Sequence, residues 1–474
     1  MGGFTSPVYR IVSYSSKGTL LDYDAFPHRA FREYDIRGIV EEEITEELAY
    51  SLGQAFATML PANESRPVIV ARDVRISGPA ILSAVIEGLL DGGIDVIDIG
   101  MTPTPLAYYG VFHLDGAGCV MVTASHNPGD YNGFKMMKGR DSLHGEDIQT
   151  LKGHMLKSLD RAPNRGSLQS LDLLSDYADF ITNDIHLSRS LKVVIDAGNG
   201  PSGIIAAPIY RALGCEVIEL YCEPDGSFPN HHPDPTVEAN MQDLAAVVRE
   251  QNADLGIAFD GDGDRIGVVD EQGEMVWGDM LLLLLSRHLL NQHPGATIIS
   301  EVKCSQHMYD DIRARGGNPI MWRTGHSPIK AKMKATGALL AGEMSGHMFF
   351  ADRFFGFDDA VYAGARVMQV IADQSRSTSE ILADVPRAVT TPEIRVECPD
   401  DCKFNLVEEA KAYFIGLGYE IIDVDGMRVK FEDGWGLLRA SNTQPCLVLR
   451  FEAPTEARLS EMRTLIESWL EDHA

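Results

Sequence analysis

Residues 68–99 read VIVARDVRISGPAILSAVIEGLLDGGIDVIDI, and this stretch decides the fold. The apolar run at 68–71 is typical of a buried strand and ends at a polar turn. An apolar helical pattern opens at the SGP of 77–79 and stops at the glycines of 92–93, before a second strand at 94–99. A strand, a helix and another strand in this order predict a βαβ unit with parallel strands.

The same order recurs twice. The second copy has strands at 193–196 and 215–220, with GPSG at 200–203 between them. The third, looser copy has strands at 297–300 and 319–322, with KCS at 303–305 and two glycines at 316–317. We interpret the recurrence as three related α/β domains with mostly parallel mixed sheets; a coincidental repeat of a common unit is the alternative.

A different pattern begins near Thr391. Residues 404–416 favour a helix, 419–424, 429–431 and 447–451 favour strands, and 454–473 favour a final amphipathic helix. This order predicts a small α+β domain. The expected domains are therefore 1–172, 173–274, 275–386 and 387–474.

Composition excludes several classes of protein. The 474 residues are 45% hydrophobic and 23% charged, which is typical of a globular chain. A net charge of −28 argues against nucleic-acid and acidic-membrane partners. The aliphatic stretch at 280–285 is too short to span a bilayer, for which about 20 residues are needed. The N-terminus fits no signal peptide, although MGGFTS at 1–6 matches a loose myristoylation pattern; a disordered tail is the alternative.

Seven cysteines without a CxxC pair indicate scattered reduced thiols. This usage, together with the lack of a targeting or membrane-spanning segment, predicts a cytoplasmic protein. We expect small-molecule partners only, and a monomer, with a dimer as the alternative.

A polar loop, TASHNP at 123–128, follows the apolar strand at 119–122. The hydroxyl of Ser125 beside the imidazole of His126 suits a bound anion or an activated nucleophile. A helix N-cap by Ser125 or Asn127 is the alternative. Lys135 follows closely and could neutralise a phosphate or move a proton.

A second loop, DGDGDR at 260–265, alternates three carboxylates with glycine. Asp260, Asp262 and Asp264 can converge on one hard divalent cation because glycine permits the tight curvature. Glu271 stands where an EF-hand would have its last ligand, but residues 266–270 continue as a strand and not as a helix. We therefore favour Mg²⁺ completed by phosphate oxygens over a Ca²⁺ loop or a solvated turn.

In a third loop, GEMSGH at 342–347, alternation places Glu343, Ser345 and His347 on one face. A carboxylate and a hydroxyl suit sugar hydroxyls, and the imidazole could act as acid or base. A polar strand edge is the alternative.

A fourth loop, RASNTQP at 439–445, has the composition of a phosphate clamp, with a plain turn as the alternative. YDIRG at 34–38 adds Arg37 beside Tyr34, and the chain has no P-loop and no strand-linked GxGxxG. A nucleophile, a metal site, sugar acceptors and a clamp together indicate phosphoryl transfer on a sugar phosphate.

These four loops, in this order, resemble those of the α-D-phosphohexomutase superfamily, and most closely its bifunctional bacterial phosphomannomutase/phosphoglucomutase branch. The resemblance runs from about Phe31 to the C-terminal helix. It implies three α/β domains and a TATA-box-binding-protein-like fourth domain around a central cleft. Met344 is similar to the mannose/glucose enzymes, whereas phosphoglucosamine mutases more often have Gln there; Ala124 and Gln444 are small departures.

The resemblance also implies a reaction. Ser125 would carry a phosphoryl group that moves phosphate between O6 and O1 of a hexose through a hexose 1,6-bisphosphate, which is also the expected activator. The implied metal is Mg²⁺, held by Asp260, Asp262, Asp264 and an oxygen of phosphorylated Ser125. The implied catalytic residues are Ser125, His126, Lys135, Arg37, His347 and Arg265. The implied substrate-binding residues are Tyr34, Lys303, His326, Glu343, Ser345, Arg439, Ser441, Asn442 and Thr443.

Three other readings stay open at this point: a phosphoglucosamine mutase, a non-catalytic phosphosugar-binding protein and a metal-dependent phosphatase. The sequence leaves undecided the preferred sugar epimer, the phosphorylation state of Ser125, the oligomeric state, the downstream pathway and the role of the first 25 or so residues.

Overall fold

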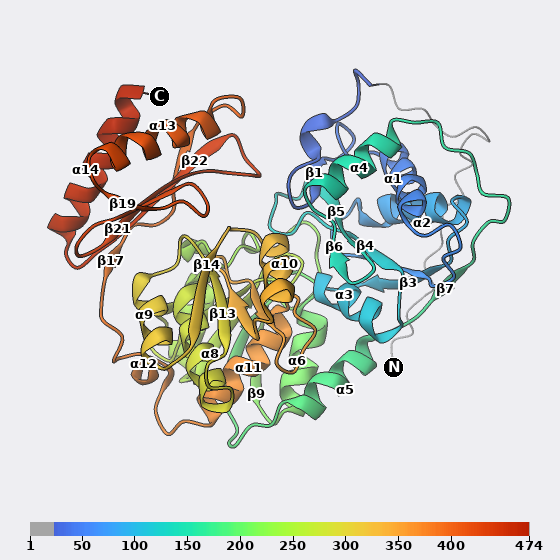
Figure 1. Cartoon of the computed structure of the whole chain (residues 1–474). Coiled ribbons are helices and arrows are strands. Elements are labelled where there is room, and N and C mark those ends of the chain that lie inside the picture. The colour runs from blue at the N-terminus through green and yellow to red at the C-terminus, as the bar shows by residue number, and fades with distance from the viewer. Residues whose placement is uncertain (1–22, 474) are drawn as a thin grey trace. The chain divides into compact units, whose positions relative to one another are not determined.

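The computed structural model describes residues 23–473 (Figure 1). The myristoylation pattern at 1–6 and most of the expected tail lie outside the described residues. The chain divides into two compact units. Of the described residues, the first unit holds those from 23 to His186 with Val194–Asp243 and Ala258–Asp264. The second holds Leu187–Val193, Leu244–Ile257 and those from Arg265 to His473.

The first domain is built on a seven-stranded mixed sheet. Its strands are β1 (Ile36–Ile39), β2 (Val68–Arg72), β3 (Val96–Met101), β4 (Gly118–Val122), β5 (Tyr131–Lys138), β6 (Asp141–Ser142) and β7 (Leu168–Ser170). The order is β1-β5-β4-β2-β3-β7, with β6 on β5. Strands β4, β2, β3 and β7 run parallel, whereas β5 is antiparallel to both β4 and β1. The carboxyl ends of β2 and β4 therefore lie side by side.

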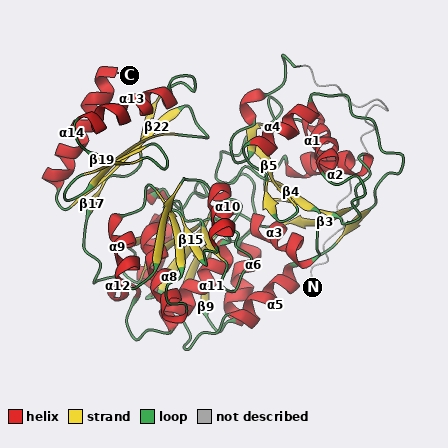
Figure 2. Ribbon diagram, viewed as in Figure 1, coloured by secondary structure: helices red, strands yellow, loops and turns green. Residues whose placement is uncertain are grey.

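Helices cover both faces of this sheet (Figure 2). They are α1 (Glu46–Met59), α2 (Gly78–Asp91), α3 (Thr104–His113), α4 (Glu146–Met155) and α5 (Leu174–Asp184). Val68 and Val70 of β2 pack into one core with α1, α2 and α4. Ile69, which points the other way, lies against Gly110 of α3. Alternate residues of a fully buried strand thus serve two cores.

The second sheet has the order β12-β11-β10-β8-β9. Its strands are β8 (Lys192–Asp196), β9 (Glu216–Leu220), β10 (Leu255–Phe259), β11 (Ile266–Asp270) and β12 (Met275–Val276), with helices α6 (Gly203–Ala212) and α7 (Gln242–Gln251). The boundary between the two compact units passes through β8 and β10 of this sheet.

The third sheet has the order β14-β13-β15-β16 and is mixed. Its strands are β13 (Thr297–Glu301), β14 (Asn318–Trp322), β15 (Leu340–Gly342) and β16 (Met348–Phe350). Strand β13 is parallel to β14 and β15, and β16 returns antiparallel to β15. Its helices are α8 (Gly278–Gln292), α9 (Gln306–Ala314), α10 (His326–Thr336), α11 (Ala360–Ala372) and α12 (Thr378–Ile381).

The C-terminal domain is an antiparallel sheet of six strands. They are β17 (Val389–Thr390), β18 (Ile394–Glu397), β19 (Glu420–Ile422), β20 (Met427–Lys430), β21 (Trp435–Ala440) and β22 (Cys446–Ala453). Helices α13 (Lys403–Gly416) and α14 (Glu456–His473) contribute to its core. The predicted fold of three α/β domains followed by an α+β domain is confirmed.

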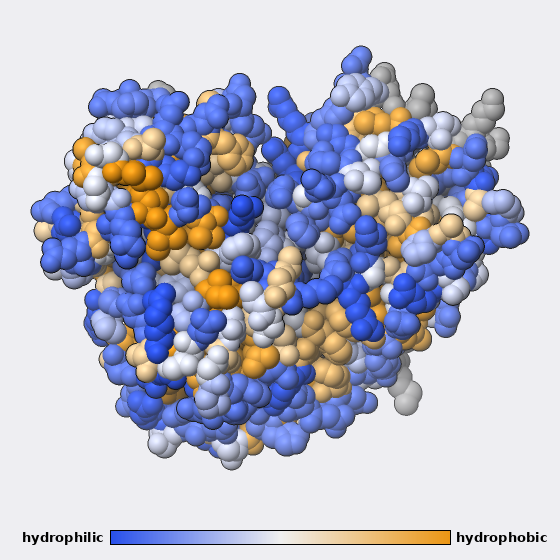
Figure 3. Space-filling model, viewed as in Figure 1, coloured by the Kyte–Doolittle hydropathy of each residue, from blue (hydrophilic) through white to orange (hydrophobic). Residues whose placement is uncertain are grey.

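Polar side chains cover most of the face that Figure 3 displays. No helix in the described part of the chain is both long and apolar enough to cross a membrane.

Candidate active site

Ser125 lies in a tight loop directly after β4. Its backbone φ is +50°, a left-handed conformation that side chains other than glycine seldom adopt. Its N–H donates to Thr123 Oγ1 at 2.9 Å, and its hydroxyl donates to Asp260 Oδ2 at 2.7 Å. His126 Nδ1 lies 3.2 Å from the same hydroxyl. Strand β5 follows this loop where a capped helix would have to begin, so the helix-cap alternative for Ser125 or Asn127 is wrong.

A buried arginine that sequence reasoning missed donates hydrogen bonds to the backbone of this loop. The Arg75 guanidinium donates to four backbone carbonyls: those of Ser125 (2.8 Å), Asn127 (2.6 Å), Pro128 (2.6 Å) and Tyr131 (2.8 Å). Its Nε also donates to Asp73 at 3.2 Å. The available signal was position, because Arg75 follows the carboxyl end of β2, the parallel neighbour of β4.

The three aspartates that follow β10 are fully buried, which rules out a solvated turn. One oxygen of each lies within 4.8 Å of the others. Asp260 Oδ1 accepts from the backbone N–H groups of Gly263 and Asp264 at 3.0 and 3.1 Å. A Cβ at Gly261 would lie 2.4 Å from the carbonyl oxygen of Ser125, so only glycine permits this approach of the two loops.

Lys135 reaches these aspartates from β5. Its Nζ donates to Asp262 Oδ2 at 2.7 Å and also contacts Asp264. Burial disfavours the charged ammonium, but the carboxylates of Asp262 and Asp264 outweigh burial and hold the pKa of Lys135 above its usual value. Burial likewise disfavours the Asp262 carboxylate, yet the charge of Lys135 keeps the pKa of Asp262 below its usual range.

The aspartate cluster fits a hard divalent cation. Asp262 Oδ1 is buried and accepts no hydrogen bond from the residues that the structure describes. Carboxylate oxygens are the ligands that Mg²⁺ and Ca²⁺ use in proteins. Strand β11 follows the loop, as expected, and Glu271 accepts from Ser379 Oγ at 2.5 Å. The EF-hand reading therefore lacks both its second helix and its last ligand.

Arg37 enters the Ser125 site from β1. Its Nη1 donates to Asn127 Oδ1 at 2.8 Å, and its Nε donates to Asp35 at 2.8 Å. Tyr34 is half-buried just before this strand. Within the first unit, the structure thus brings Ser125, His126, Lys135, Arg37 and the three aspartates together.

The GEMSGH segment is a turn between β15 and β16. The N–H of Glu343 donates to the carbonyl of His347 at 2.9 Å, which closes the turn. The expected alternation along one strand face therefore does not apply. Glu343 is buried and accepts from the N–H of Gly325 at 2.6 Å, whereas Ser345 is half-buried. Burial raises the pKa of Glu343.

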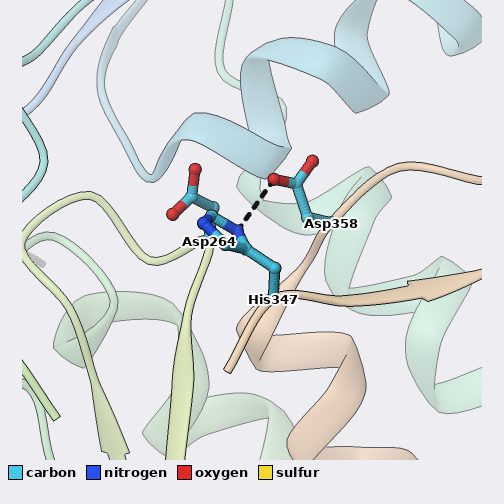
Figure 4. Close-up of side chains that lie close together, drawn as sticks. All are labelled: Asp264, His347 and Asp358. Carbon is cyan, nitrogen blue, oxygen red and sulfur yellow. Dashed lines mark ion pairs between the residues drawn. The ribbon is translucent and has the colours of Figure 1, made fainter. Parts of the chain in front are cut away.

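The His347 ring lies between the guanidinium of an arginine and a carboxylate, and both belong to the second unit. Arg265 Nε donates to His347 Nε2 at 3.0 Å, so Nδ1 carries the hydrogen. That nitrogen lies 3.0 Å from Asp358 Oδ2 (Figure 4). Lys330 also pairs with Asp358, at 2.9 Å, and the His326 ring stacks on that of His347 with centroids 5.6 Å apart.

Asp358 is a further residue that sequence reasoning missed. Burial disfavours its charge, but Lys330 and the neighbouring imidazoles outweigh burial and hold its pKa well below the usual range. Asp358 is the first aspartate of the GFDD run that precedes α11, and this run matches no motif by which the residue could have been recognised.

Lys303 and the fourth loop lie in the same unit. Lys303 Nζ pairs with Glu393 at 3.2 Å. Burial opposes the charge of Lys303, and the carboxylates of Glu393 and Glu301 outweigh it, so its pKa is raised. Arg439 leaves β21 and donates through Nε to Asp425 at 3.0 Å.

The remaining residues of the predicted phosphate clamp form the β21–β22 turn. Ser441 Oγ accepts from the N–H groups of Thr443 and Gln444 at 3.3 and 3.1 Å. Asn442 is half-buried and Thr443 is exposed. Lys403 Nζ donates to the carbonyls of Ser441 and Gln444 at 2.5 and 2.8 Å and so supports the turn from below.

Four protein-family models match successive parts of the chain. They are phosphoglucomutase/phosphomannomutase α/β/α domain I at residues 28–158, domain II at 175–273, domain III at 277–389 and the C-terminal domain at 393–467.

Full-length relatives agree with this match. A phosphomannomutase/phosphoglucomutase of Pseudomonas aeruginosa is 47% identical over 94% of this chain and 96% of its own. A phosphoglucomutase of Neisseria gonorrhoeae is 45% identical over 94% and 97%. The crystal structure of a phosphoglucomutase/phosphomannomutase family protein from Burkholderia thailandensis superposes with a TM-score of 0.87 at 41% identity, covering 93% of this chain and 98% of that one. From its first α/β domain to its C-terminal domain, the chain belongs to the phosphoglucomutase/phosphomannomutase family of α-D-phosphohexomutases.

Proposed function

We propose that the protein is a phosphohexomutase that interconverts the 6-phosphates and 1-phosphates of mannose and glucose. The observation that carries the proposal is the Ser125 hydroxyl, which lies 2.7 Å from Asp260 inside a buried cluster of three aspartates and Lys135. Relatives at 45–47% identity are named phosphomannomutase/phosphoglucomutase, and Met344 agrees with them.

The proposed reaction moves one phosphoryl group at a time. A hexose 6-phosphate binds next to phosphorylated Ser125. The bond between Ser125 Oγ and phosphorus breaks, and a bond forms between phosphorus and sugar O1 as the O1 hydroxyl loses its proton. The hexose 1,6-bisphosphate then returns its 6-phosphoryl group to Ser125 and leaves as the 1-phosphate. Free hexose 1,6-bisphosphate activates the protein by phosphorylating Ser125 in the same way.

The residues of the first unit have separate tasks in this reaction. Arg75 and Thr123 fix the Ser125 backbone, and Arg37 offers positive charge next to the loop. Lys135 Nζ contacts Asp262 and Asp264 beside the Ser125 loop, so we assign it stabilisation of phosphoryl charge. A Mg²⁺ ion held by Asp260, Asp262 and Asp264 supplies further positive charge to the phosphoryl oxygens when it is bound.

The residues of the second unit provide recognition. Glu343 and Ser345 are proposed to bind ring hydroxyls, and His347, fixed by Arg265 and Asp358, to carry a proton. The phosphate that is not reacting would be bound by Arg439, Ser441, Asn442 and Thr443. Lys303 and His326 are proposed to contact the substrate, as is Tyr34 of the first unit. His126, also of the first unit, is proposed to assist at Ser125. A cytoplasmic location and a monomeric state stay predictions.

The test is a turnover assay with the purified full chain. Mannose 1-phosphate with Mg²⁺ and a trace of hexose 1,6-bisphosphate should give mannose 6-phosphate, glucose 1-phosphate should react comparably, and glucosamine 1-phosphate should react poorly. Chelation of the metal, or Ser125→Ala, should abolish turnover, whereas Ser190→Ala at an exposed serine should not. Release of inorganic phosphate without isomerisation would indicate a phosphatase, and a preference for the glucosamine sugar would indicate a phosphoglucosamine mutase.

A further inference from the structure

Cys398 and Cys402 form a close thiol pair in the C-terminal domain. Their sulfur atoms lie 3.6 Å apart, and both residues are free thiols. Cys398 follows β18 and is buried, whereas Cys402 immediately precedes α13 and is the exposed member of the seven cysteines. A disulfide requires the sulfurs to approach to about 2.05 Å, which from this distance is a small adjustment of two side chains in a surface turn.

The turn that carries this pair supports the proposed phosphate clamp. The N–H of Cys398 donates to the carbonyl of Pro445 at 3.0 Å. Lys403, the residue after Cys402, donates to the carbonyls of Ser441 and Gln444 and pairs with Asp400 at 2.7 Å. Three hydrogen bonds thus connect residues 398–403 to the backbone of the clamp. A disulfide across this short turn would move the Cys398 N–H and the Lys403 side chain together, and so would disturb all three hydrogen bonds.

We propose that Cys398 and Cys402 are a redox modification site, which small-molecule disulfides oxidise to an intramolecular disulfide that loosens the phosphate clamp. The exposed Cys402 thiolate attacks the small disulfide and releases one thiol, which leaves a mixed disulfide on Cys402. Cys398 then loses its proton and attacks the Cys402 sulfur, releasing the second thiol. One small disulfide is reduced to two thiols, and the protein loses two hydrogens.

The order of these steps follows from exposure. Burial, with help from the neighbouring Cys402 thiol, raises the pKa of Cys398 to about 11, so at neutral pH it is almost wholly protonated. Since the thiolate is the attacking species, Cys398 is the slower and later partner. The remaining cysteines are buried or half-buried.

The first test is intact-mass analysis of the full chain after incubation with oxidised glutathione. The wild type should lose two hydrogens, peptide mapping should place one cross-link between Cys398 and Cys402, and dithiothreitol should reverse it. Cys398→Ser should instead retain one glutathione on Cys402, and Cys402→Ser should remain unmodified. Cys222→Ser, at a half-buried cysteine, should behave as the wild type does. A wild type that keeps glutathione without cross-linking, or that pairs other cysteines, would overturn the site.

The second test measures the effect on the clamp, and this arm alone rests on the proposed mutase function. The oxidised protein should show a KM for mannose 1-phosphate raised about tenfold, the loss expected when one or two hydrogen bonds weaken, with kcat changed less. Dithiothreitol should restore KM, and Cys402→Ser should show no change with oxidant. A cross-linked protein with unaltered KM would refute the coupling to the clamp. A reduced protein without any mutase activity would refute the proposed function, while the mass measurement would still decide the disulfide.

Discussion

At the scale of the residue, the site depends on buried side chains that hold the loops in place. Ser125 adopts a left-handed backbone conformation. In a residue with a side chain this conformation costs of order 1–3 kcal/mol, and it persists only where contacts with neighbouring groups hold it in place. Arg75 is that neighbour, since one planar guanidinium holds four carbonyls of the loop at once. The motif TASHNP led to the proposed nucleophile, Ser125, but the arginine that holds its loop lies 50 residues earlier in the chain.

Arg75→Lys should lower kcat by about 100-fold, because a lysine keeps the charge but cannot satisfy four carbonyls with the same fork, and small misplacements of reacting groups cost this much. KM should change by less than kcat, which a general loss of folded protein would not produce. Arg165→Lys, at a half-exposed arginine, is the matched control. Unchanged kcat in a folded Arg75→Lys variant would show that the loop does not need this anchor.

Glu343→Gln should stabilise the protein in a pH-dependent way. The pKa of Glu343 is raised by burial, so the folded state binds its proton more tightly than the unfolded state does, and stability is lost as pH rises from the ordinary value of 4.5 through the raised pKa. Gln cannot ionise, yet its carbonyl oxygen can still accept from Gly325. The Tm advantage of the variant should therefore be small at pH 4 and largest at pH 8. An advantage that shrinks with rising pH would contradict the assigned shift.

At the scale of the element, periodicity predicted much of the fold and failed where polar residues are buried. The three strand–helix–strand segments and helices α13 and α14 formed as predicted, because apolar runs and glycine stops are local signals. Strand β5 was missed as a strand, because Asn132 and Lys135 look like loop residues. In the structure both are buried with partners: Asn132 donates to Ser77 Oγ, and Lys135 donates to Asp262 and Asp264. The turn at 343–347 was missed because its closing hydrogen bond joins residues that a strand would separate.

The α1–α2 contact depends on glycines that allow close approach. A Cβ at Gly88 would lie 2.1 Å from the carbonyl oxygen of Tyr50, which is backbone and cannot rotate away. Gly88→Ala should therefore destabilise the folded state by about 1–3 kcal/mol, as overpacking does. Gly153→Ala in α4 meets nothing within 4 Å and should stabilise by about 0.5–1 kcal/mol. Chemical denaturation measures the free energy of unfolding of both variants. Equal changes in the two variants would show that a side chain at Gly88 can be accommodated.

At the scale of the whole molecule, the C-terminal domain is fastened within the second unit by a buried cation. Arg428 of β20 donates to the carbonyls of Val302 and Cys304 at 2.7 and 3.0 Å and stacks on Trp435 with its charge 3.8 Å from the ring centroid. Burial lowers the pKa of Arg428. No sequence motif indicated this contact, because it forms between a strand of one domain and the β13–α9 turn of another.

Arg428→Met should weaken this attachment, since the two carbonyls would lose their donor while the methionine keeps most of the packing. We expect faster amide hydrogen exchange in residues 302–304 and in β20, with α14 unchanged. Arg313→Met, at an exposed arginine of α9, should leave exchange at wild-type rates. Protection retained at 302–304 in Arg428→Met would show that apolar packing alone holds the domain.

The central claim, that Ser125 carries the phosphoryl group which the protein transfers, is tested most directly by mass spectrometry of Ser125 during one turnover. Unmodified protein mixed with glucose 1,6-bisphosphate should gain one phosphate that maps to Ser125, and added mannose 6-phosphate should remove it as bisphosphate. Ser125→Ala should gain none. A protein that isomerises mannose phosphate while Ser125 stays unmodified, or that gains phosphate elsewhere, would contradict the account.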